Sequence, residues 1–238
     1  MRMRIIGMIG GTGWVSTLEY YRLLNEEVNR RLGGLEAAQC ILYSFNFGEV
    51  TRLKENDPEQ SRVRELILRT ARILAGAGAE CLVLCANTLH LFAEDVERAT
   101  DLPLVHIADA TAKEIRQAGL DRVGLLGTRL TMEKDFYRRR LAAAGVEILV
   151  PGEAEREYID NAIFNELVKG VFRPEVRGRF LEIMDELHRC GAQGIIMGCT
   201  EIPLLVRPED TDLLLFDTLA IHARAVIDFA LTGEQGGS

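Results

Sequence analysis

The chain has 238 residues, of which 47% are hydrophobic, and a formal net charge of −8. This length allows one large domain or two lobes of ordinary size, and the acidic balance argues against a nucleic-acid surface, which needs clustered Lys and Arg. No apolar run approaches the roughly 20 residues that span a bilayer, and the N-terminus leads into a strand pattern without a signal-peptide core. We therefore expect a cytoplasmic protein without membrane partners.

The first segments of the chain read as a strand, a glycine turn and a helix. Residues 4–10 are nearly all apolar, which is typical of a strand buried on both faces of a parallel sheet. The glycine turn occupies residues 10–13, and Ser16 or Thr17 is the expected helix cap. Gly33 is the expected end of the helix. The elements predicted up to residue 107 are a helix at 18–32, a strand at 39–47, a polar loop at 49–56, a helix at 59–77, a strand at 81–84, a helix at 90–99 and a strand at 102–107.

The second half repeats the alternation of strands and helices. Its predicted elements are a helix ending at 117, a strand at 122–128, a helix through Tyr137 ending near 145, a strand at 146–150, helices at 158–169 and 174–189, strands at 194–198 and 213–216, a helix to 231 and a frayed tail at 234–238. Such alternation implies parallel sheets flanked by helices. We expect an α/β protein with two lobes related by a pseudo-twofold axis, one formed by residues 1–112 and 217–238 and the other by 113–216.

One stretch of sequence occurs twice, as a buried-looking strand followed by a small polar turn. Residues 81–88 align without a gap to residues 194–201, so that Cys199 stands opposite Ala86. In parallel sheets, ligands bind beyond the carboxyl ends of the strands. Both turns, the glycine turn and Thr128 lie at such ends, and we expect the active site in a cleft between the lobes.

The glycine turn at 10–13 lacks the third glycine of a dinucleotide-binding fingerprint and the lysine of a P-loop. Backbone N–H groups at the start of a helix also attract a carboxylate, because the helix dipole favours negative charge there. A carboxylate ligand is therefore preferred over a nucleotide.

Cys199 is the cysteine most suited to chemistry, because it follows a glycine at the end of a strand pattern. The chain has five cysteines without CxxC pairs, so we expect neither a disulfide framework nor a metal site. Backbone N–H groups and a helix start after Cys199 predict a lowered thiol pKa. A nucleophilic thiolate would need an activating histidine, for which His90 and His106 are candidates. Two equivalent groups on opposite faces of a flat carbon would instead suit racemisation.

Three motifs resemble the signatures of the cofactor-independent aspartate/glutamate racemase family, and the similarity extends over essentially the whole chain. They are Gly10-Gly11-Thr12-Gly13-Trp14, Asn87-Thr88-Leu89-His90 and Gly198-Cys199-Thr200-Glu201-Ile202-Pro203-Leu204-Leu205. Within the family, the chain looks most similar to the broad-specificity or L-aspartate/glutamate-specific branch. The resemblance implies an isomerase without pyridoxal phosphate or metal, a small amino-acid substrate with a carboxylate side chain, and a homodimer.

The resemblance also implies roles for individual residues. Cys199 corresponds to the base on one face of the substrate Cα, and Lys169 matches a lysine that helps to hold a carboxylate in family members, although a surface lysine at a helix end is the alternative. Thr128 and Glu201 join the expected site because they lie at the same strand ends. The expected substrate-binding residues are Thr12, Asn87, Thr88, Thr128, Lys169, Thr200 and Glu201.

Ala86 departs from the family pattern. Two-cysteine members carry the second catalytic cysteine at this position, and L-specific members can carry threonine. A methyl group can neither accept nor donate a proton. Cys85 is adjacent, but one step along a strand reverses the direction of a side chain.

Several explanations of Ala86 are open. The chain could be an engineered variant that traps substrate, or a natural racemase that protonates the second face through water, Thr88 or Cys85. It could also be a one-cysteine lyase or decarboxylase of the same superfamily, or a catalytically silent protein that binds an amino acid. The racemase framework is preferred.

Overall fold

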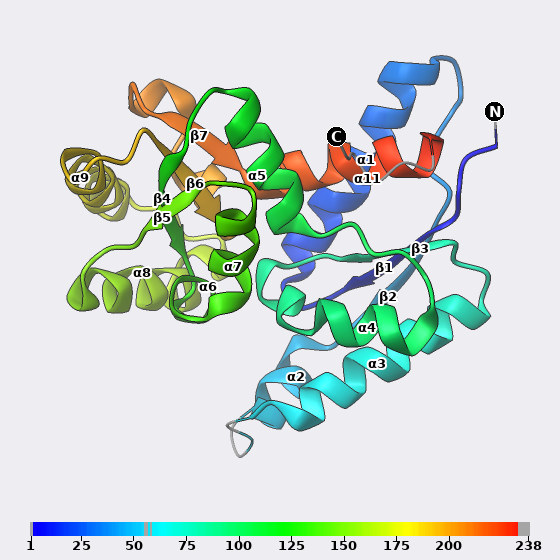
Figure 1. The fold of residues 1–238 in the computed structure, drawn as a ribbon. Coiled ribbons are helices and arrows are strands. Elements are labelled where there is room, and N and C mark those ends of the chain that lie inside the picture. Colours follow the sequence, from blue (N-terminus) through cyan, green and yellow to red (C-terminus); the bar gives the residue numbers. More distant parts are fainter. Residues whose placement is uncertain (1, 55–56, 58, 233–238) are drawn as a thin grey trace. The chain divides into compact units, whose positions relative to one another are not determined.

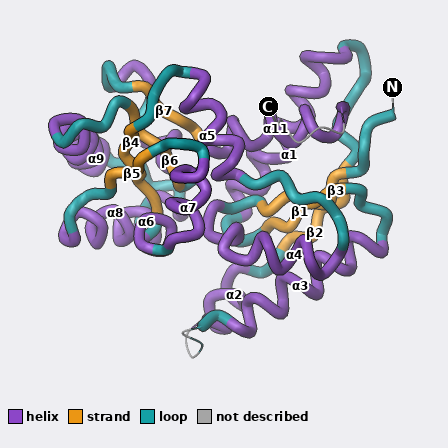
Figure 2. Tube along the Cα trace, in the orientation of Figure 1, coloured by secondary structure: helices purple, strands orange, loops and turns teal. Residues whose placement is uncertain are grey.

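The computed structural model describes residues 2–54, 57 and 59–232. The chain divides into two compact units, one formed by the residues up to His106 and from His222 onward, the other by Ile107–Ile221. The boundaries expected from the sequence lie at residues 112 and 217. The tail expected at 234–238 lies outside the described residues. Each unit is a parallel sheet flanked by helices, which confirms the predicted fold class (Figures 1 and 2).

The first unit is built on a three-stranded sheet in the order β2-β1-β3. In Figure 1, α3 and α4 cover one face of this sheet, and α1 and α11 lie on the other. The core between the sheet and α3 contains Ile9, Val63, Ile67 and Leu74. The elements of this unit are β1 (Ile6–Gly10), α1 (Trp14–Leu32), β2 (Cys40–Ser44), α2 (Phe47–Lys54), α3 (Ser61–Gly76), β3 (Cys81–Leu84), the 3₁₀ helix η1 (Asn87–Phe92), α4 (Ala93–Thr100) and most of α11 (Thr218–Thr232).

The start of α1 differs from the prediction. The helix begins at Trp14 with Gly13 at the cap position, so neither Ser16 nor Thr17 is the cap. Both hydroxyl groups instead donate hydrogen bonds back to the carbonyl of Gly13, over 2.8 and 3.1 Å, as side chains in a first helical turn often do. Gly33 ends the helix in the left-handed region at φ 74°, as predicted.

Two further elements of the first unit were predicted wrongly. The described part of the polar loop is the helix α2, which the side chain of Asn46 caps by accepting a hydrogen bond from the N–H of Gly48; residues 55 and 56 lie outside the described chain. The strand expected at 102–107 is reduced to one bridge between Leu82 and Leu104. Pro103 has no N–H to donate to a ladder, and its carbonyl accepts from the N–H of Leu82.

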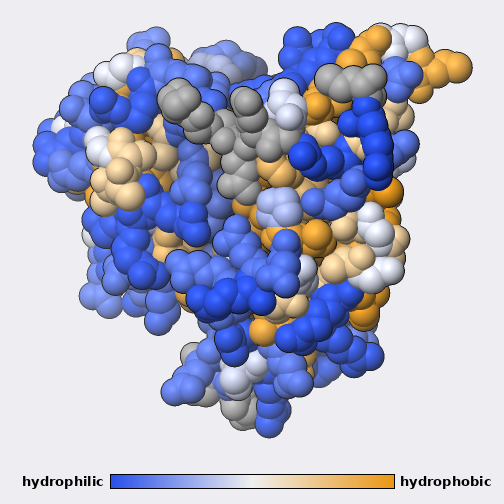
Figure 3. All heavy atoms as spheres, turned by 45° about the vertical axis from the view of Figure 1, so that its right-hand side comes forward, coloured by the Kyte–Doolittle hydropathy of each residue, from blue (hydrophilic) through white to orange (hydrophobic). Residues whose placement is uncertain are grey.

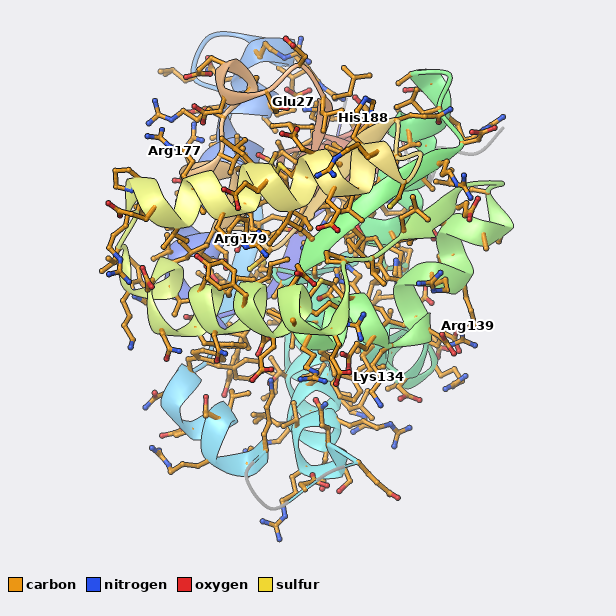
Figure 4. The ribbon with its side chains drawn as sticks, turned by 90° about the vertical axis from the view of Figure 1, so that its left-hand side faces the viewer. Glu27, Lys134, Arg139, Arg177, Arg179 and His188 are labelled. Atoms are coloured by element: carbon orange, nitrogen blue, oxygen red, sulfur yellow. The ribbon has the colours of Figure 1, made fainter. Side chains whose placement is uncertain are left out.

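The second unit contains a four-stranded sheet in the order β5-β4-β6-β7. Figure 4 shows α8 and α9 side by side, with Arg179 between them, and Arg179 bonds Glu155 of α8 and Glu182 of α9. The elements are α5 (Ile107–Gln117), β4 (Arg122–Gly127), α6 (Arg129–Glu133), α7 (Asp135–Ala143), β5 (Glu147–Leu149), α8 (Glu153–Asn165), the 3₁₀ helix η2 (Leu167–Lys169), α9 (Pro174–Arg189), β6 (Gly194–Gly198), α10 (Ile202–Leu205), the 3₁₀ helix η3 (Pro208–Asp210) and β7 (Leu214–Asp217).

The repeated stretch forms equivalent strands in the two units. β3 pairs in parallel with β1, and β6 pairs in parallel with β4, the first strand of its own unit. Each strand leads into its polar turn at the carboxyl end of the sheet. None of the helices in the described part of the chain is long and apolar enough to cross a membrane.

Candidate active site

Cys199 lies at the start of the turn that follows β6. Its thiol donates a hydrogen bond to Oε2 of Glu201 over 3.0 Å, and the hydroxyl of Thr200 donates to the same oxygen over 2.8 Å. Cys199 is 9% exposed and Glu201 is 5% exposed. The turn closes through the N–H of Ile202, which donates to the carbonyl of Cys199. We call Cys199, Thr200 and Glu201 the thiol cluster.

The thiol pKa of Cys199 is raised, not lowered as the sequence analysis expected. Burial is the main cause, and the negative charge of Glu201 and the hydrogen bond to it add to the effect. The backbone N–H groups of Glu201 and Thr200 act in the opposite direction but do not prevail. The following helix, α10, has only four residues and so offers a weak dipole. The resting thiol therefore holds its proton, and Glu201 is the group placed to accept it.

A pair of glycines brings the ends of β4 and β6 together. Gly127 is the partner of Gly198 in the parallel ladder. A Cβ on Gly198 would lie 2.9 Å from the carbonyl oxygen of Leu126, and a Cβ on Gly127 would lie 2.9 Å from that of Gly198. Because Thr128 and Cys199 follow these glycines, they lie at neighbouring strand ends. The expected strand-end position of Thr128 is confirmed, and its role in substrate binding stays a prediction.

Two threonines that the sequence analysis did not select support this edge of the sheet. The hydroxyl of Thr131 lies 3.2 Å from that of Thr128. The hydroxyl of Thr218 donates to the carbonyl of Met197 in β6 over 2.9 Å. Thr218 directly follows β7, so the same rule that selected Thr128 could have found it.

Lys169 lies at the end of η2, the 3₁₀ helix that follows α8. It is exposed and precedes Gly170, whose φ of 75° closes the helix. An exposed lysine at a helix end fits either expectation, and its role in holding a carboxylate stays a prediction.

The turn after β3 carries Ala86, Asn87 and Thr88 in the first unit. Ala86 is extended and precedes η1, Asn87 is buried, and Thr88 is partly exposed. Cys85 is 1% exposed, and burial raises the pKa of its thiol. Cys199 is also buried with a raised pKa, but its thiol bonds a carboxylate that can take the proton, whereas the less exposed Cys85 is a poor replacement for a base at position 86.

The glycine turn lies beside the Ala86 turn, because the N–H of Cys85 donates to the carbonyl of Ile9 at the end of β1. Gly11 has φ 86°, and a Cβ there would meet the backbone of Phe45. Its N–H donates to the hydroxyl of Thr17 over 2.8 Å, so an internal oxygen already occupies this donor. Thr12 is partly exposed at the tip of the turn.

The two candidate histidines belong to the first unit, and Cys199 belongs to the second. His90 and His106 are buried in the first unit, where Nδ1 of His90 bonds the carbonyl of Ala86. The hydrogen-bond partner of the Cys199 thiol is the carboxylate of Glu201, and activation by a histidine stays a prediction. Within the described residues, no group of three or more His, Cys, Asp or Glu side chains is arranged to hold a metal ion.

Comparison with known proteins identifies the family. The family model of Asp/Glu/Hydantoin racemases matches residues 9–226. The chain belongs to this family. As a member it is an isomerase, an amino-acid racemase by class.

Three relatives illustrate the similarity. A candidate Asp/Glu racemase from Yersinia pestis shares 46% identity and a TM-score of 0.90, over 97% of this chain and 100% of its own. An aspartate racemase homologue from Pyrococcus horikoshii OT3 shares 36% identity and a TM-score of 0.81, over 96% and 99%. The broad specificity amino-acid racemase RacX of Bacillus subtilis is 22% identical over 94% of this chain and 96% of its own.

Proposed function

We propose that the protein is a racemase-type enzyme for aspartate or glutamate that moves the Cα proton with Cys199, without pyridoxal phosphate or a metal ion. The hydrogen bond from the Cys199 thiol to Glu201 carries this proposal. It joins an acid–base group to a carboxylate that can take its proton, as general acid–base catalysis requires.

The proton moves in two steps on the side of Cys199. Glu201 first accepts the thiol proton, and the backbone N–H groups of Thr200 and Glu201 stabilise the resulting thiolate. The thiolate then removes the α-proton of the bound amino acid, leaving a carbanion. Returning that proton to the same face restores the starting enantiomer, whereas racemisation requires a proton on the opposite face.

Several polar residues at strand ends, together with Lys169, are proposed to bind the substrate. Asn87, Thr88, Thr12 and Thr200 hold the α-carboxylate and ammonium groups, Thr128 lines the strand end beside Cys199, and Lys169 meets a carboxylate. Support comes from the position of Thr12, Asn87, Thr88, Thr128 and Thr200 after the carboxyl ends of parallel strands.

Ala86 makes the proposed chemistry one-sided. With a methyl group on the second face, the enzyme exchanges the α-proton of one enantiomer with solvent much faster than it racemises that enantiomer. Water or Thr88 then supplies a slow route to the second face.

Proton NMR in heavy water tests this proposal. L- and D-aspartate and L- and D-glutamate are incubated with the wild type and with Ala86→Cys and Ala86→Thr. The wild type should replace the α-hydrogen of a single enantiomer with retention of configuration, and Ala86→Cys should form both enantiomers. Absence of exchange in all three folded proteins, for all four substrates, contradicts the proposal.

One observation favours a second candidate function, a decarboxylase. Cys199 aligns with Ala86 in the repeated stretch, and a single thiol paired with a small side chain suits loss of carbon dioxide from a substituted malonate, followed by protonation of the carbanion by Cys199 on one face. Carbon dioxide release with a chiral product, and no exchange with amino acids, would select this reaction. Binding of aspartate with no turnover even in Ala86→Cys would indicate an amino-acid-binding protein.

We further propose a homodimer. Large apolar side chains are exposed on α1 (Trp14, Leu18 and Tyr21) and on the edge strand β2 (Leu42 and Tyr43), and Figure 3 shows hydrophobic residues at the surface of the first unit. Exposed apolar patches of this kind mark protein interfaces. Light scattering should give twice the 26.5 kDa chain mass, and Leu18→Lys with Tyr21→Lys should give the monomer.

A cytoplasmic location is part of the same proposal. All five cysteines are free thiols, as is usual in reducing compartments. Cell fractionation with an antibody against the chain tests the location.

A further inference from the structure

Three of the four histidines of the chain are buried together in the first unit. His90, His106 and His222 are each at most 5% exposed, and the ring of His90 lies edge-on to the other two, at centroid distances of 4.7 and 5.3 Å. Tyr20, which is fully buried, packs against His222. Burial of so many polar rings costs free energy unless they are hydrogen-bonded. We call these four residues the histidine brace.

The hydrogen bonds of the brace fix its tautomers. Nε2 of His222 lies 2.8 Å from the carbonyl of Val105, and a carbonyl only accepts, so Nε2 carries the proton. Nδ1 of His222 is then the acceptor for the hydroxyl of Tyr20, over 2.7 Å. By the same argument, Nδ1 of His90 carries a proton and donates it to the carbonyl of Ala86 over 3.1 Å.

The bond from His90 controls the orientation of the Ala86–Asn87 peptide. The carbonyl of Ala86 accepts from the N–H of Leu89 as well as from the ring of His90. Because a peptide is planar and trans, fixing this carbonyl also fixes the direction of the N–H of Asn87 and the start of its side chain. The ring therefore sets the geometry of the turn before Thr88.

The brace also lies at both points where the chain passes between the units. His106 is the last residue of the first unit before Ile107, and His222 is the first residue after Ile221. The bond from His222 to Val105 ties these two crossings together within the first unit. His90 thus links the turn at Ala86 to the hydrogen bond between His222 and Val105, because its ring bonds Ala86 and packs against His222.

We propose that His90, held by His106, His222 and Tyr20, is a positioning residue that orients the Ala86–Thr88 turn through its Nδ1–H bond to Ala86 and thereby sets the affinity for the substrate. The inference rests on the proposed function for the identity of the ligand. It assigns no proton transfer to His90.

A pair of matched substitutions tests the role of the Nδ1–H group. His90→Asn places an amide N–H on the atom equivalent to Nδ1 and keeps the donor, whereas His90→Leu keeps an apolar side chain without it. Calorimetric titration with aspartate should give a dissociation constant within about threefold of the wild type for His90→Asn and at least tenfold weaker for His90→Leu. Equal affinities in the two variants, whether both normal or both weakened, overturn the proposal.

Measurements that need no substrate separate this proposal from the proposed function. If the wild type binds neither aspartate nor glutamate, the proposed function fails, and the brace is judged by NMR alone. The wild type should show the Nδ1–H tautomer at His90, and His90→Leu but not His90→Asn should lose hydrogen-exchange protection at Leu89. If His90→Leu does not fold, His90→Gln, whose amide lies nearer the Nε2 position, replaces it in both measurements. An Nε2–H tautomer at His90 in the wild type overturns the proposal, even where no variant folds.

Discussion

The turns after β3 and β6 close with equivalent backbone hydrogen bonds, from Leu89 to Ala86 and from Ile202 to Cys199. Their side-chain hydrogen bonds differ. Both turns follow a strand that pairs with the first strand of its unit. After β6, the side chains of Cys199, Thr200 and Glu201 bond one another. After β3, the side chain of Ala86 is inert, and its carbonyl is bound by the ring of His90. The repeat therefore gives both turns the same position at a strand end. Their side chains decide whether a turn can transfer a proton or can only bind a ligand.

Removal of the Cys199 thiol should have the largest effect on α-proton exchange, because neither the turn after β3 nor the turn after β6 would then carry a group that accepts the α-proton. We expect Cys199→Ala to lower the rate of α-proton exchange by about 10²- to 10⁴-fold, the usual contribution of one general acid–base group. NMR in heavy water measures the rate. Cys85→Ala is the matched control, since its buried thiol should leave the rate near that of the wild type. Equal rate losses in Cys199→Ala and Cys85→Ala would contradict a specific role of Cys199 in proton transfer.

Acid should lower the free energy of unfolding, because His222, which is buried in the unit that contains Ala86, must gain a proton. Burial lowers the pKa of His222 to about 4 from its ordinary value of 6.5. Between these values the unfolded chain binds more protons than the folded one, so stability falls as the pH drops from 6.5 toward 4. The full loss is about 3 kcal/mol, at 1.36 kcal/mol for each pKa unit.

The pH dependence is measured by urea unfolding of the wild type and His222→Gln between pH 7 and 4. The glutamine amide can still donate toward Val105 but does not titrate, so the variant should lose less stability across this window. Carboxylates contribute equally to both proteins, and only the difference reports on His222. Parallel curves for the two proteins would show that His222 does not titrate as expected.

The order of the strands, the doubled turn and the residues at the strand ends could be predicted from the sequence, because apolar runs and glycine stops are local signals. The helix α2 could not, since only Val50 of its eight residues is buried and its helical face forms against α3. Nor could the raised pKa of Cys199, which depends on burial and on a 3.0 Å contact with Glu201. The contact of Tyr20 with His222 joins segments far apart in the chain, and no local pattern encodes it.

Replacement of Glu201 by glutamine tests the role of the carboxylate charge in the thiol cluster while the thiol of Cys199 is kept. In Glu201→Gln the uncharged amide cannot take the thiol proton, and we expect exchange to slow by about tenfold to a hundredfold, less than the usual 10²- to 10⁴-fold contribution of an acid–base group because the thiol itself remains. The negative charge that raises the thiol pKa is also lost, so the pH midpoint for alkylation of Cys199 should fall. Peptide mass spectrometry gives this midpoint, with the exposed Cys190 as the internal reference. An unchanged midpoint would mean that burial alone sets the pKa.

A pair of glycine substitutions has the smallest expected effect. It tests whether the close contact between the ends of β4 and β6 holds Cys199 in place. In Gly198→Ala, the new Cβ would lie 2.8 Å from Cδ1 of Leu125 and 2.9 Å from the carbonyl oxygen of Leu126. Overpacking of this kind costs about 1–3 kcal/mol, and the displaced strand end should also slow exchange. Gly178→Ala is the control, because its Cβ meets nothing within 4 Å in the middle of α9. This change should raise the free energy of unfolding by about 0.4–1 kcal/mol. Similar unfolding curves for the two variants would mean that the strand end tolerates a Cβ, and the contrast between the two turns would then rest on their side chains alone.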